Sequence, residues 1–222
     1  ADACFGHRLM MDCVVPGGVA SDINDEGLEY LGAFLAEVGR VFPKLVELYD
    51  NTPSLQDRTA KTGILTNKLA QQFGAGGYVG RASGRAFDAR KQPGYVPYDE
   101  LDFKLVTHDD GDVNARVWVR IGEVEQSLSM IKQIMQRLPE GSLAASPRGA
   151  GSTAEGAALV EGFRGDILVW LRIKAGRVQR CHLRDPSWFQ WPLLEAAIEG
   201  NIVADFPLCN KSFNCSYSGH DL

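Results

Sequence analysis

The stretch LVEGFRGDILVWLRIKAGRVQRCHLRDPSWF, residues 159–189, decides the fold of this chain. From Ile167 to Lys174 the side chains form two alternating sets, the period-two pattern that is typical of a half-buried strand. Ala175-Gly176 provides a tight reversal, and Val178 to Arg184 is predicted to return as a second strand. Ala157 to Glu161 can pair in front of them as a third strand. The stretch therefore predicts an antiparallel β-meander.

The turn inside this meander carries three charged residues, Glu161, Arg164 and Asp166, which are our candidate catalytic residues. Glycines flank the tip of the turn and permit positive φ and a close approach of the backbone. An arginine held between glycines is always charged and forks toward planar anions, so Arg164 is a candidate contact for a ligand or a transition state. The alternative is an ordinary hairpin turn in which Arg164 pairs with Asp166, and spacing alone favours this alternative.

Composition and charge narrow the class of protein. The 222 residues are 45% apolar, which suits a soluble globular core. With 23 Lys+Arg against 28 Asp+Glu, the formal charge is -5 and no basic run could follow a phosphate backbone, so no nucleic acid partner is expected. No apolar stretch of about 20 residues is present, so no transmembrane segment is expected. The first residues lack an initiator methionine and indicate a fragment of a longer polypeptide.

The cysteines indicate neither a disulfide framework nor a self-contained zinc site. They form an odd set without a CxxC motif, which suits a reducing cytosol: Cys4, Cys13, Cys181, Cys209 and Cys215. Five residues separate Cys209 from Cys215, whereas two intervening residues let neighbouring thiolates face one metal. We therefore expect that Cys209 and Cys215 are not a pair of metal ligands, and that Cys215 is a small buried apolar residue.

Two long amphipathic helices are predicted, at about Asn24 to Tyr49 and Asp112 to Leu138. Their apolar stripes step by three and four: Leu28, Leu31, Leu35, Val38, Phe42, Leu45 and Tyr49 in the first, and Val113, Val117, Ile121, Val124, Leu128, Ile131, Met135 and Leu138 in the second. Pro43 is expected to kink the first helix. We predict an α+β fold with a single domain over residues 1–222, in which the helices pack by these stripes and the meander covers one end. Residues 140–156, rich in Gly, Ser and Ala, are predicted to be a flexible loop.

Smaller segments are also predicted from local patterns. Arg116, Arg120, Glu123 and Ser127 share a polar face that is expected to be solvated, the alternative being a face toward a cavity or partner. The glycines of residues 74–84 indicate a close-packed contact rather than a phosphate cradle, with Arg81 and Arg85 available for an anionic partner. We further expect a short strand at Leu101 to Val106, a short helix at Pro192 to Glu199 and a C-terminal tail that packs inward.

Four segments, in order along the chain, resemble motifs of one known family. The first is residues 6–19, GHRLMMDCVVPGGV, and the second is Arg81-Ala82-Ser83-Gly84 with Asp88 and Arg90, which is similar to R-A-S-G-x-x-x-D-x-R. The third is residues 112–127, DVNARVWVRIGEVEQS, similar to G-D-V-x-x-R…V-R-x-x-E-x-x-Q-S, and the fourth is Glu161 to Asp166, similar to E-A-P-R-G-E. Phe163 stands for the proline and Asp166 for the second glutamate of that last motif. The chain resembles the large subunit shared by membrane-bound nickel-iron hydrogenases and the quinone-site (D-type) subunit of respiratory complex I. The resemblance covers nearly the whole chain but only the C-terminal portion of the family's length.

The resemblance implies a place for the charged turn. In hydrogenases of the family the arginine of this turn lies over the nickel-iron centre, and Arg164 is its match. The C-terminal motif departs, because those enzymes end in D-P-C-x-x-C whereas this chain has FNCSYS at residues 213–218. A nickel-iron site of this type needs four thiolates, so no such centre is expected here. Complex I subunits use the vacated cavity for quinone, and we expect Cys215, Ser218 and His220 to line that cavity.

The leading hypothesis is a subunit of a complex I-like or hydrogenase-like oxidoreductase that takes part in electron transfer to quinone or a related acceptor. The resemblance implies an iron-sulfur small subunit and membrane subunits as partners, because no spaced cysteine set here could hold a cluster. Activity would require these partners, on the cytoplasmic side and peripheral to the inner membrane. The alternative is a catalytically inactive structural subunit that kept the fold and lost the metal site. An upstream R-x-C-G-x-C motif would favour a metalloenzyme.

Overall fold

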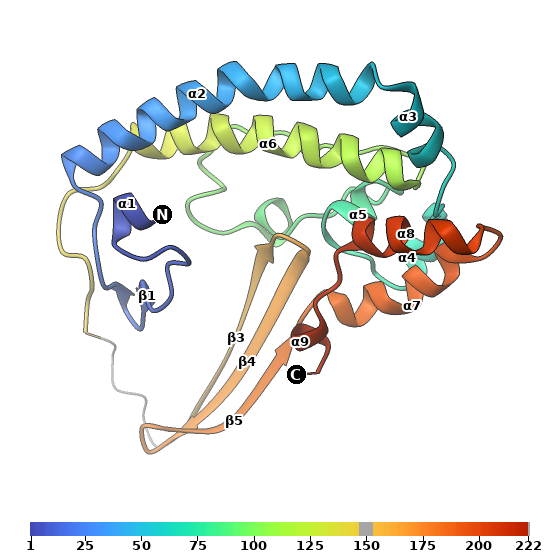
Figure 1. The fold of residues 1–222 in the computed structure, drawn as a ribbon. Helices are drawn as coiled ribbons and strands as arrows, with labels where there is room; N and C mark the ends of the chain where they lie inside the picture. The colour runs from blue at the N-terminus through green and yellow to red at the C-terminus, as the bar shows by residue number, and fades with distance from the viewer. Residues whose placement is uncertain (147–152, 222) are drawn as a thin grey trace.

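The computed structural model describes residues 1–146 and 153–221. Two long helices lie alongside each other, and a three-stranded sheet projects from them (Figure 1). The elements in chain order are α1 (Asp2–Phe5), β1 (Val14–Val15), β2 (Gly18–Val19), α2 (Asp25–Asp50), α3 (Pro53–Thr59), α4 (Asn67–Gln72), α5 (Gly77–Arg81), η1 (Arg90–Gly94), α6 (Val113–Met135), β3 (Thr153–Gly162), β4 (Gly165–Lys174), β5 (Arg177–Arg184), α7 (Ser187–Ile198), η2 (Val203–Asp205), α8 (Phe206–Phe213) and α9 (Tyr217–His220).

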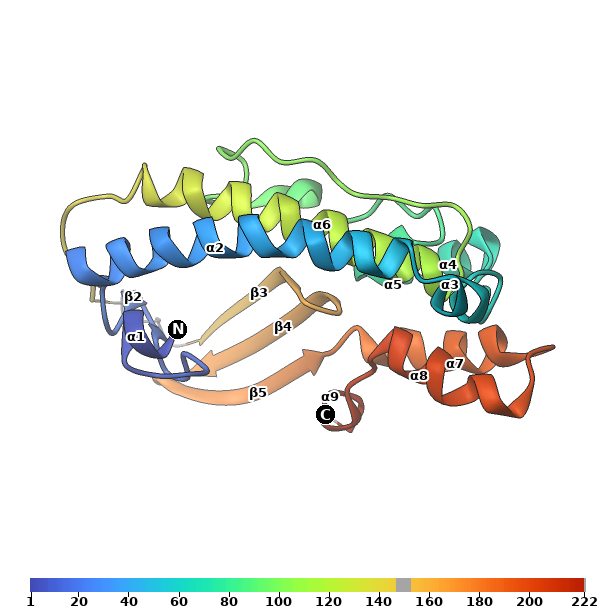
Figure 2. The same ribbon diagram turned by 45° about the horizontal axis from the view of Figure 1, so that its top comes forward.

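The long helices α2 and α6 are those that the apolar stripes predicted, and Figure 2 shows them running alongside each other. The side chain of Asn24 caps α2 by accepting a hydrogen bond from the backbone nitrogen of Gly27 at 2.8 Å. Asp112 caps α6 in the same way, accepting from the backbone nitrogen of Ala115 at 2.7 Å. Pro43 lies inside α2, which continues past it as one element. Local capping therefore sets where both helices begin.

Burial along the two helices follows the predicted stripes only in part, because the fully buried residues of α6 include Ala115, Arg116, Val119 and Met130, which lie outside its stripe. Among six residues chosen from these stripes, Leu35 is buried and the others are half-buried: Leu28, Phe42, Val117, Val124 and Leu128. Leu45 belongs to the same predicted stripe but is 56% exposed. The stripes therefore mark a half-buried side of each helix, and they missed the face of α6 that is buried most deeply.

The polar face predicted on α6 is not uniformly solvated. Arg116 is 1% exposed, and its guanidinium donates hydrogen bonds to the carbonyls of Gly63 (2.8 Å) and Gly111 (2.7 Å). The expectation of a solvated face was wrong at this residue, because three hydrogen-bond acceptors around the guanidinium replace water. The third acceptor is the hydroxyl of Ser212 in α8, at 2.9 Å. Arg116 thereby links three separate segments of the core.

The predicted meander is confirmed as a sheet in the order β3-β4-β5, with antiparallel pairing throughout. Ala175 (φ 49°) and Gly176 (φ 72°) form the tight β4–β5 turn. β3 is longer than predicted and begins at Thr153, so the predicted loop at 140–156 is corrected at that end. Residues 147–152 of that predicted loop lie outside the described residues. A second sheet consists of the short strands β1 and β2.

The strand predicted at Leu101 to Val106 does not form. The segment runs alongside α6, where side-chain amides bond its backbone in place of a neighbouring strand. Gln133 accepts from the backbone nitrogen of Asp102 at 2.9 Å, and Gln126 accepts from that of Lys104 at 2.9 Å. Backbone groups need partners but not strand partners, so the apolar pattern of this segment indicated burial rather than a sheet.

The main core lies where α5 and α6 meet the C-terminal helices. Its fully buried side chains are Leu65, Tyr78, Val79, Val119, Leu193, Cys209 and Phe213. The helix predicted at Pro192 to Glu199 begins earlier, at Ser187, and Gly200 (φ 75°) follows its end. The tail packs inward as predicted, since Cys209 and Phe213 in α8 are 0% exposed. Figure 1 shows α7 and α8 together at one end of the molecule, with α9 nearer the middle beside the end of β5.

Candidate functional site

The turn between β3 and β4 is fixed by main-chain contacts to α5. A Cβ atom added at Gly77, where φ is +61°, would lie 2.2 Å from the carbonyl oxygen of Arg164. One added at Gly76 would lie 2.3 Å from a carboxylate oxygen of Asp166. The side-chain nitrogen of Gln190 in α7 donates to the carbonyl of Arg164 at 2.7 Å. The glycine-rich segment is thus a close contact as expected, but against this turn rather than against other helices.

Arg164 reaches from the turn to the C-terminal tail. Its Nε donates to the carbonyl oxygen of Asn214, and its Nη2 donates to Oδ1 of the same residue at 3.1 Å. Asn214 ends α8 in the left-handed conformation, with φ 53°, so its carbonyl and its side chain both face the guanidinium. The alternative in which Arg164 pairs with Asp166 is wrong. The structure brings Arg164 to the tail, beside Cys215.

Asp166 has a different partner. Its carboxylate forms an ion pair with Arg184 at the end of β5, and its carbonyl accepts from the same guanidinium at 3.0 Å. The Asp166 residue is 8% exposed. Its contacts join β4, β5 and α5, so the structure gives Asp166 a clear role in holding the turn in place.

Glu161, at the end of β3, lies in a buried cluster of charges. Its side chain is 4% exposed and forms an ion pair with Arg81 at 3.1 Å. The other carboxylate oxygen accepts from the backbone nitrogen of Ala89 at 2.9 Å. Arg81 also pairs with Asp88 at 3.2 Å and with Glu123 of α6. Arg81 was expected to be available for an anionic partner, which was wrong because these three carboxylates of the chain itself already surround it.

Two carboxyl groups of this cluster, Glu161 and Asp88, have pKa values that are shifted in opposite directions. Burial raises the pKa of Glu161, and the charge of Arg81 only partly offsets it. Burial also acts to raise the pKa of Asp88, but Arg90 and Arg81 outweigh it and hold that pKa below its ordinary value. Arg90 is bonded to Asp88 at 2.6 Å. Asp88 is therefore the firmly ionised member, and Glu161 is the member that a proton reaches first.

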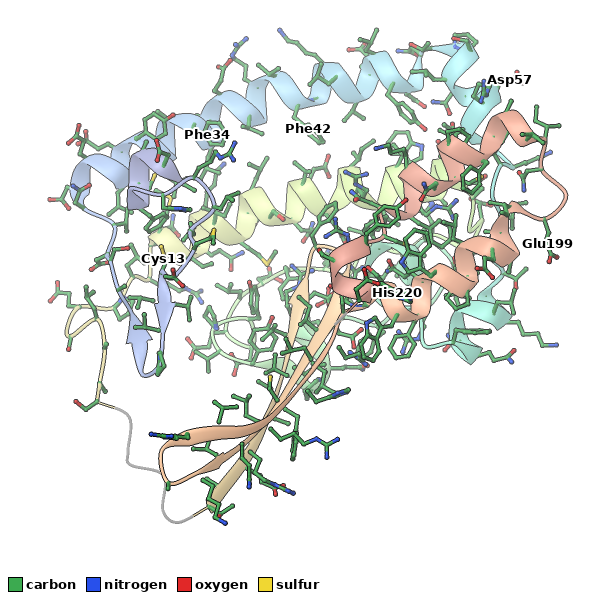
Figure 3. The ribbon with its side chains drawn as sticks, turned by 60° about the horizontal axis from the view of Figure 1, so that its bottom comes forward. Cys13, Phe34, Phe42, Asp57, Glu199 and His220 are labelled. Carbon is green, nitrogen blue, oxygen red and sulfur yellow. The ribbon has the colours of Figure 1, made fainter. Side chains whose placement is uncertain are left out.

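The residues predicted to line a cavity in the tail do not lie together. Cys215 is 8% exposed and belongs to the main apolar core, whereas Ser218 and His220 are exposed. The ring of His220 makes an edge contact with Trp191, at 6.2 Å between centroids. Figure 3 labels His220 on α9. Only Cys215 of these three adjoins Arg164, so the predicted set is corrected for Ser218 and His220.

The donor atoms of the tail do not fit a nickel-iron centre. The FNCSYS stretch at residues 213–218 offers one thiol, Cys215, whose pKa burial raises to about 11 against the opposing charge of Arg164. The neighbouring side chains Ser216 and Ser218 carry hydroxyls, which are poor ligands for a soft metal. Within residues 1–146 and 153–221 no group of three or more His, Cys, Asp or Glu side chains could hold a metal ion.

An open pocket of about 450 Å³ lies beside the turn, between α2 and α6. Phe163 forms one wall, and apolar side chains of both helices form most of the rest: Phe42, Val117, Ile121, Val124 and Leu128. Arg120, Glu123 and Ser127 add polar groups, so part of the predicted polar face does face a cavity. A smaller pocket of about 200 Å³ shares Glu123, Ser127 and Phe163 with it and reaches Glu161.

The sequence did not predict the contacts of two residues that organise this site. Arg81 is central to the charge cluster, and Asn214 is the partner of Arg164. Arg81 and Asp88 do stand in one of the motifs that carry the resemblance, so that motif was the available signal for the cluster. No local pattern marks Asn214, because its role depends on a contact between residues that are 50 positions apart.

The comparisons with known proteins agree with this architecture. Residues 1–156 match the family model described as respiratory-chain NADH dehydrogenase, 49 Kd subunit. The carbon monoxide-induced hydrogenase of Rhodospirillum rubrum is 32% identical over 218 residues, covering 96% of this chain and 60% of that protein. The D 1 subunit of the NADH-quinone oxidoreductase of Salinispora arenicola is 31% identical over 248 residues, covering 90% of this chain and 55% of that protein.

A solved structure extends the similarity to the whole chain. It is a chain of the membrane-bound sulfane sulfur reductase, an archaeal respiratory membrane complex, with a TM-score of 0.92 and 28% identity. The match covers 100% of this chain and 62% of the other. This chain therefore spans between 55% and 62% of the length of the three relatives named here. No helix in the described part of the chain is long and apolar enough to cross a membrane.

The paired long helices, the projecting meander and the charged turn define the large-subunit fold of hydrogenase-like and complex I-like redox complexes. The chain belongs to the family of the 49 kDa subunit of the respiratory-chain NADH dehydrogenase. The resemblance and the fold class drawn from the sequence are thus confirmed.

Proposed function

We propose that this chain forms the helical and meander part of the large subunit of a complex I-like or hydrogenase-like oxidoreductase. In that assembly it takes part in electron transfer to quinone or a related acceptor, at a cavity that has lost its nickel-iron site. Its partners are an iron-sulfur small subunit and membrane subunits, and the assembly lies on the cytoplasmic face of the inner membrane. Family membership and the names of the relatives support this proposal.

The observation that carries the proposal is the contact between the charged turn and the tail. Main-chain contacts with Gly77 hold the turn, and Arg164 spans from it to Asn214 beside Cys215. Arg164 makes these bonds through Nε and Nη2, and its Nη1 donates to no described residue. A positioned guanidinium of this kind can hold a planar acceptor and stabilise the negative charge that the acceptor gains on reduction.

The chain's own residues do not supply the redox centre. An iron-sulfur cluster requires a set of spaced cysteine thiolates, and the five cysteines of this sequence contain no CxxC motif. Electrons would therefore arrive from a partner subunit. What this chain contributes is orientation by Arg164 and a buried carboxyl, Glu161, that can hold a proton.

The test is turnover of the complete assembly with Arg164→Gln, measured with a short-chain quinone as acceptor. We expect a loss of about a hundredfold in kcat, the size typical of removing one group that stabilises developing charge. Because Arg164 is half-buried and bonded to Asn214, the substitution also costs about 1–2 kcal/mol of stability, more than an exposed loop arginine would. Arg40→Gln, at an exposed site on α2, is the matched control and should leave turnover unchanged.

The result also separates this proposal from a catalytically inactive structural subunit. If Arg164→Gln and the wild type turn over equally in assemblies of equal subunit composition, Arg164 does not serve the acceptor and the proposal fails. A loss of turnover that merely parallels a loss of assembled complex would point to the structural role instead.

A further inference from the structure

The projecting sheet carries a row of positive charges on one face. Alternate residues of a strand share a face, and residues paired across strands share it too. Arg172 pairs with Arg180 and Lys174 pairs with Arg177, with a register shift at Arg172/Ile173 that leaves Gln179 without a partner. Because of this extra residue, Arg177 and Arg180 share a face although they are three positions apart, and four cations meet at the outer end of β4 and β5. We call Arg172, Lys174, Arg177 and Arg180 the basic face. It lies on a chain whose formal net charge is -5.

The basic face contains two like-charge pairs directly across the strands. Arg172 is opposite Arg180, and Lys174 is opposite Arg177. Such pairs destabilise a sheet, whereas opposite charges in the same positions stabilise it. Within the sheet only Arg172 has a carboxylate opposite it, Glu155 of β3, so the other three cations are available for a contact outside the sheet.

The charges of the basic face are largely unpaired and accessible. Lys174, Arg177 and Arg180 are exposed and form no ion pair with any residue in the described ranges 1–146 and 153–221. Arg172 pairs with Glu155 of β3, its Nε lying 2.6 Å from a carboxylate oxygen. A carboxylate of the chain itself therefore already binds at one edge of this face. The pair shows which chemistry the neighbouring arginines are placed to accept.

The opposite face of the same sheet is apolar and also lacks a covering layer among the described residues. A trough of about 340 Å³ crosses it, where small residues of β3 lie beside larger residues of β4: Ala154, Gly156 and Ala158 beside Val169, Leu171 and Ile173. In Figure 1 the β4–β5 turn is the end of the sheet farthest from the long helices. The sheet thus presents two unpartnered faces of different chemistry on one projection.

We propose that the basic face docks onto an acidic protein surface, presented by another subunit of the assembly in which this chain works. The assembly itself rests on the function proposed above. The Arg172–Glu155 pair supports carboxylates as the groups bound. A lipid surface that met the basic face would leave the apolar trough in water, whereas a protein can cover both faces of the projecting sheet.

The decisive variant is Arg177→Glu/Arg180→Glu. It turns both like-charge pairs into opposite-charge pairs, so the sheet itself should be at least as stable as in the wild type. Loss of docking therefore cannot be attributed to unfolding. The matched control is Lys44→Glu/Lys211→Glu, which makes the same change in net charge at exposed positions on α2 and α8.

Two measurements test the proposal. The first is binding of labelled poly-L-glutamate to the full chain at increasing NaCl, where the wild type and the control should bind and the reversal variant should bind about tenfold or more weakly. The second is the subunit composition of the assembled complex by native mass spectrometry. We expect the reversal variant to lose one protein subunit with an acidic contact surface, and the control to retain it.

Two results would overturn the proposal. One is equal poly-L-glutamate binding and equal subunit composition in the reversal and control variants. The other is an intact complex in which the reversal abolishes only binding to phosphatidylglycerol vesicles, which would assign the face to lipid. Binding of poly-L-glutamate requires neither the assembly nor turnover. This test therefore remains valid even if the Arg164→Gln experiment rules out the proposed role in electron transfer.

Discussion

Replacing Arg81 by methionine should destabilise the chain strongly, because the guanidinium lies among three carboxylates and is 2% exposed. In this variant Asp88 still has its ion pair with Arg90, at 2.6 Å. The Glu123 side chain is 24% exposed, so water can replace the hydrogen bonds that it loses. The loss therefore falls mainly on Glu161, whose side chain is 4% exposed. Removing one partner of a buried ion pair costs about 3–5 kcal/mol, against a total stability of about 5–15 kcal/mol for a typical domain.

The reasoning predicts that a second substitution partly repairs the first. Arg81→Met leaves the Glu161 charge uncompensated, and Glu161→Gln then removes that charge. We expect the double variant to be more stable than the sum of the two single losses by about 1–3 kcal/mol, the range seen for residues in one network. Urea unfolding followed by tryptophan fluorescence measures all four free energies of the cycle.

The pH dependence of stability is a second test of the interaction between Arg81 and Glu161. Burial raises the pKa of Glu161 above its ordinary value of 4.5, and Arg81→Met removes the charge that opposes this. A carboxyl whose pKa is higher in the folded state favours the protonated form. Its stabilising contribution is fully present below the unfolded pKa and is lost as the pH rises through the folded pKa. As the pH falls from 7 to 5, Glu161 takes up a proton in Arg81→Met and loses its uncompensated charge. The difference in unfolding free energy between Arg81→Met and the double variant should therefore become smaller.

The control for this cycle is Arg40→Met, which breaks a pair with Glu37 in which both side chains are more than half exposed. That substitution should cost less than about 1 kcal/mol. Single losses in Arg81→Met and Glu161→Gln that simply add, within about 0.5 kcal/mol, would show that the two groups are not coupled and would refute the account of the cluster.

Three further predictions concern the turn and the tail. Gly77→Ala should cost more than about 3 kcal/mol of stability, because its Cβ would lie 2.2 Å from the Arg164 carbonyl oxygen and its φ is +61°. Gly94→Ala is the control and should cost about 1 kcal/mol, because its φ is +83° but no atom lies within 4 Å of the added Cβ. Thermal unfolding compares the two variants. Asn214→Ala should cost about 1–2 kcal/mol, and Asn214→Gly should recover the backbone part of that loss, since φ is 53°. Iodoacetamide at pH 8 should label exposed Cys181 rapidly and leave buried Cys209 and Cys215 unlabelled in peptide mass spectra; fast labelling of Cys215 would contradict its placement in the core.

Periodicity in the sequence predicted the elements whose pattern is long. The two helices and the meander repeat an apolar position over many residues, so their interior faces were visible without a structure. The Ala175-Gly176 reversal was visible for a different reason, since a two-residue turn is a local signal. The segment at Leu101 to Val106 shows the limit of this approach. Its partners are Gln126 and Gln133, which no strand pattern could indicate.

The sequence predicted where the candidate site lies along the chain, but it did not predict which residues its charged side chains would bind. The charged turn stood out through its glycines and charges, and Glu161, Arg164 and Asp166 do meet other segments there. Their partners come from α5, the tail and β5, and such long-range choices leave no mark on local spacing. Ser218 and His220 were placed in the cavity by analogy with a metal motif, yet the short helix α9 leaves both exposed.

The contact between Gly77 and the carbonyl of Arg164 bears on how such a site can change over generations. It joins backbone to backbone, so this contact does not depend on which side chains the turn carries. Substitutions at Phe163 or in the tail can then alter what the turn meets while the path of the chain remains the same. A lineage that loses a metal ligand thus inherits an intact frame, and a new acceptor can be accommodated one residue at a time.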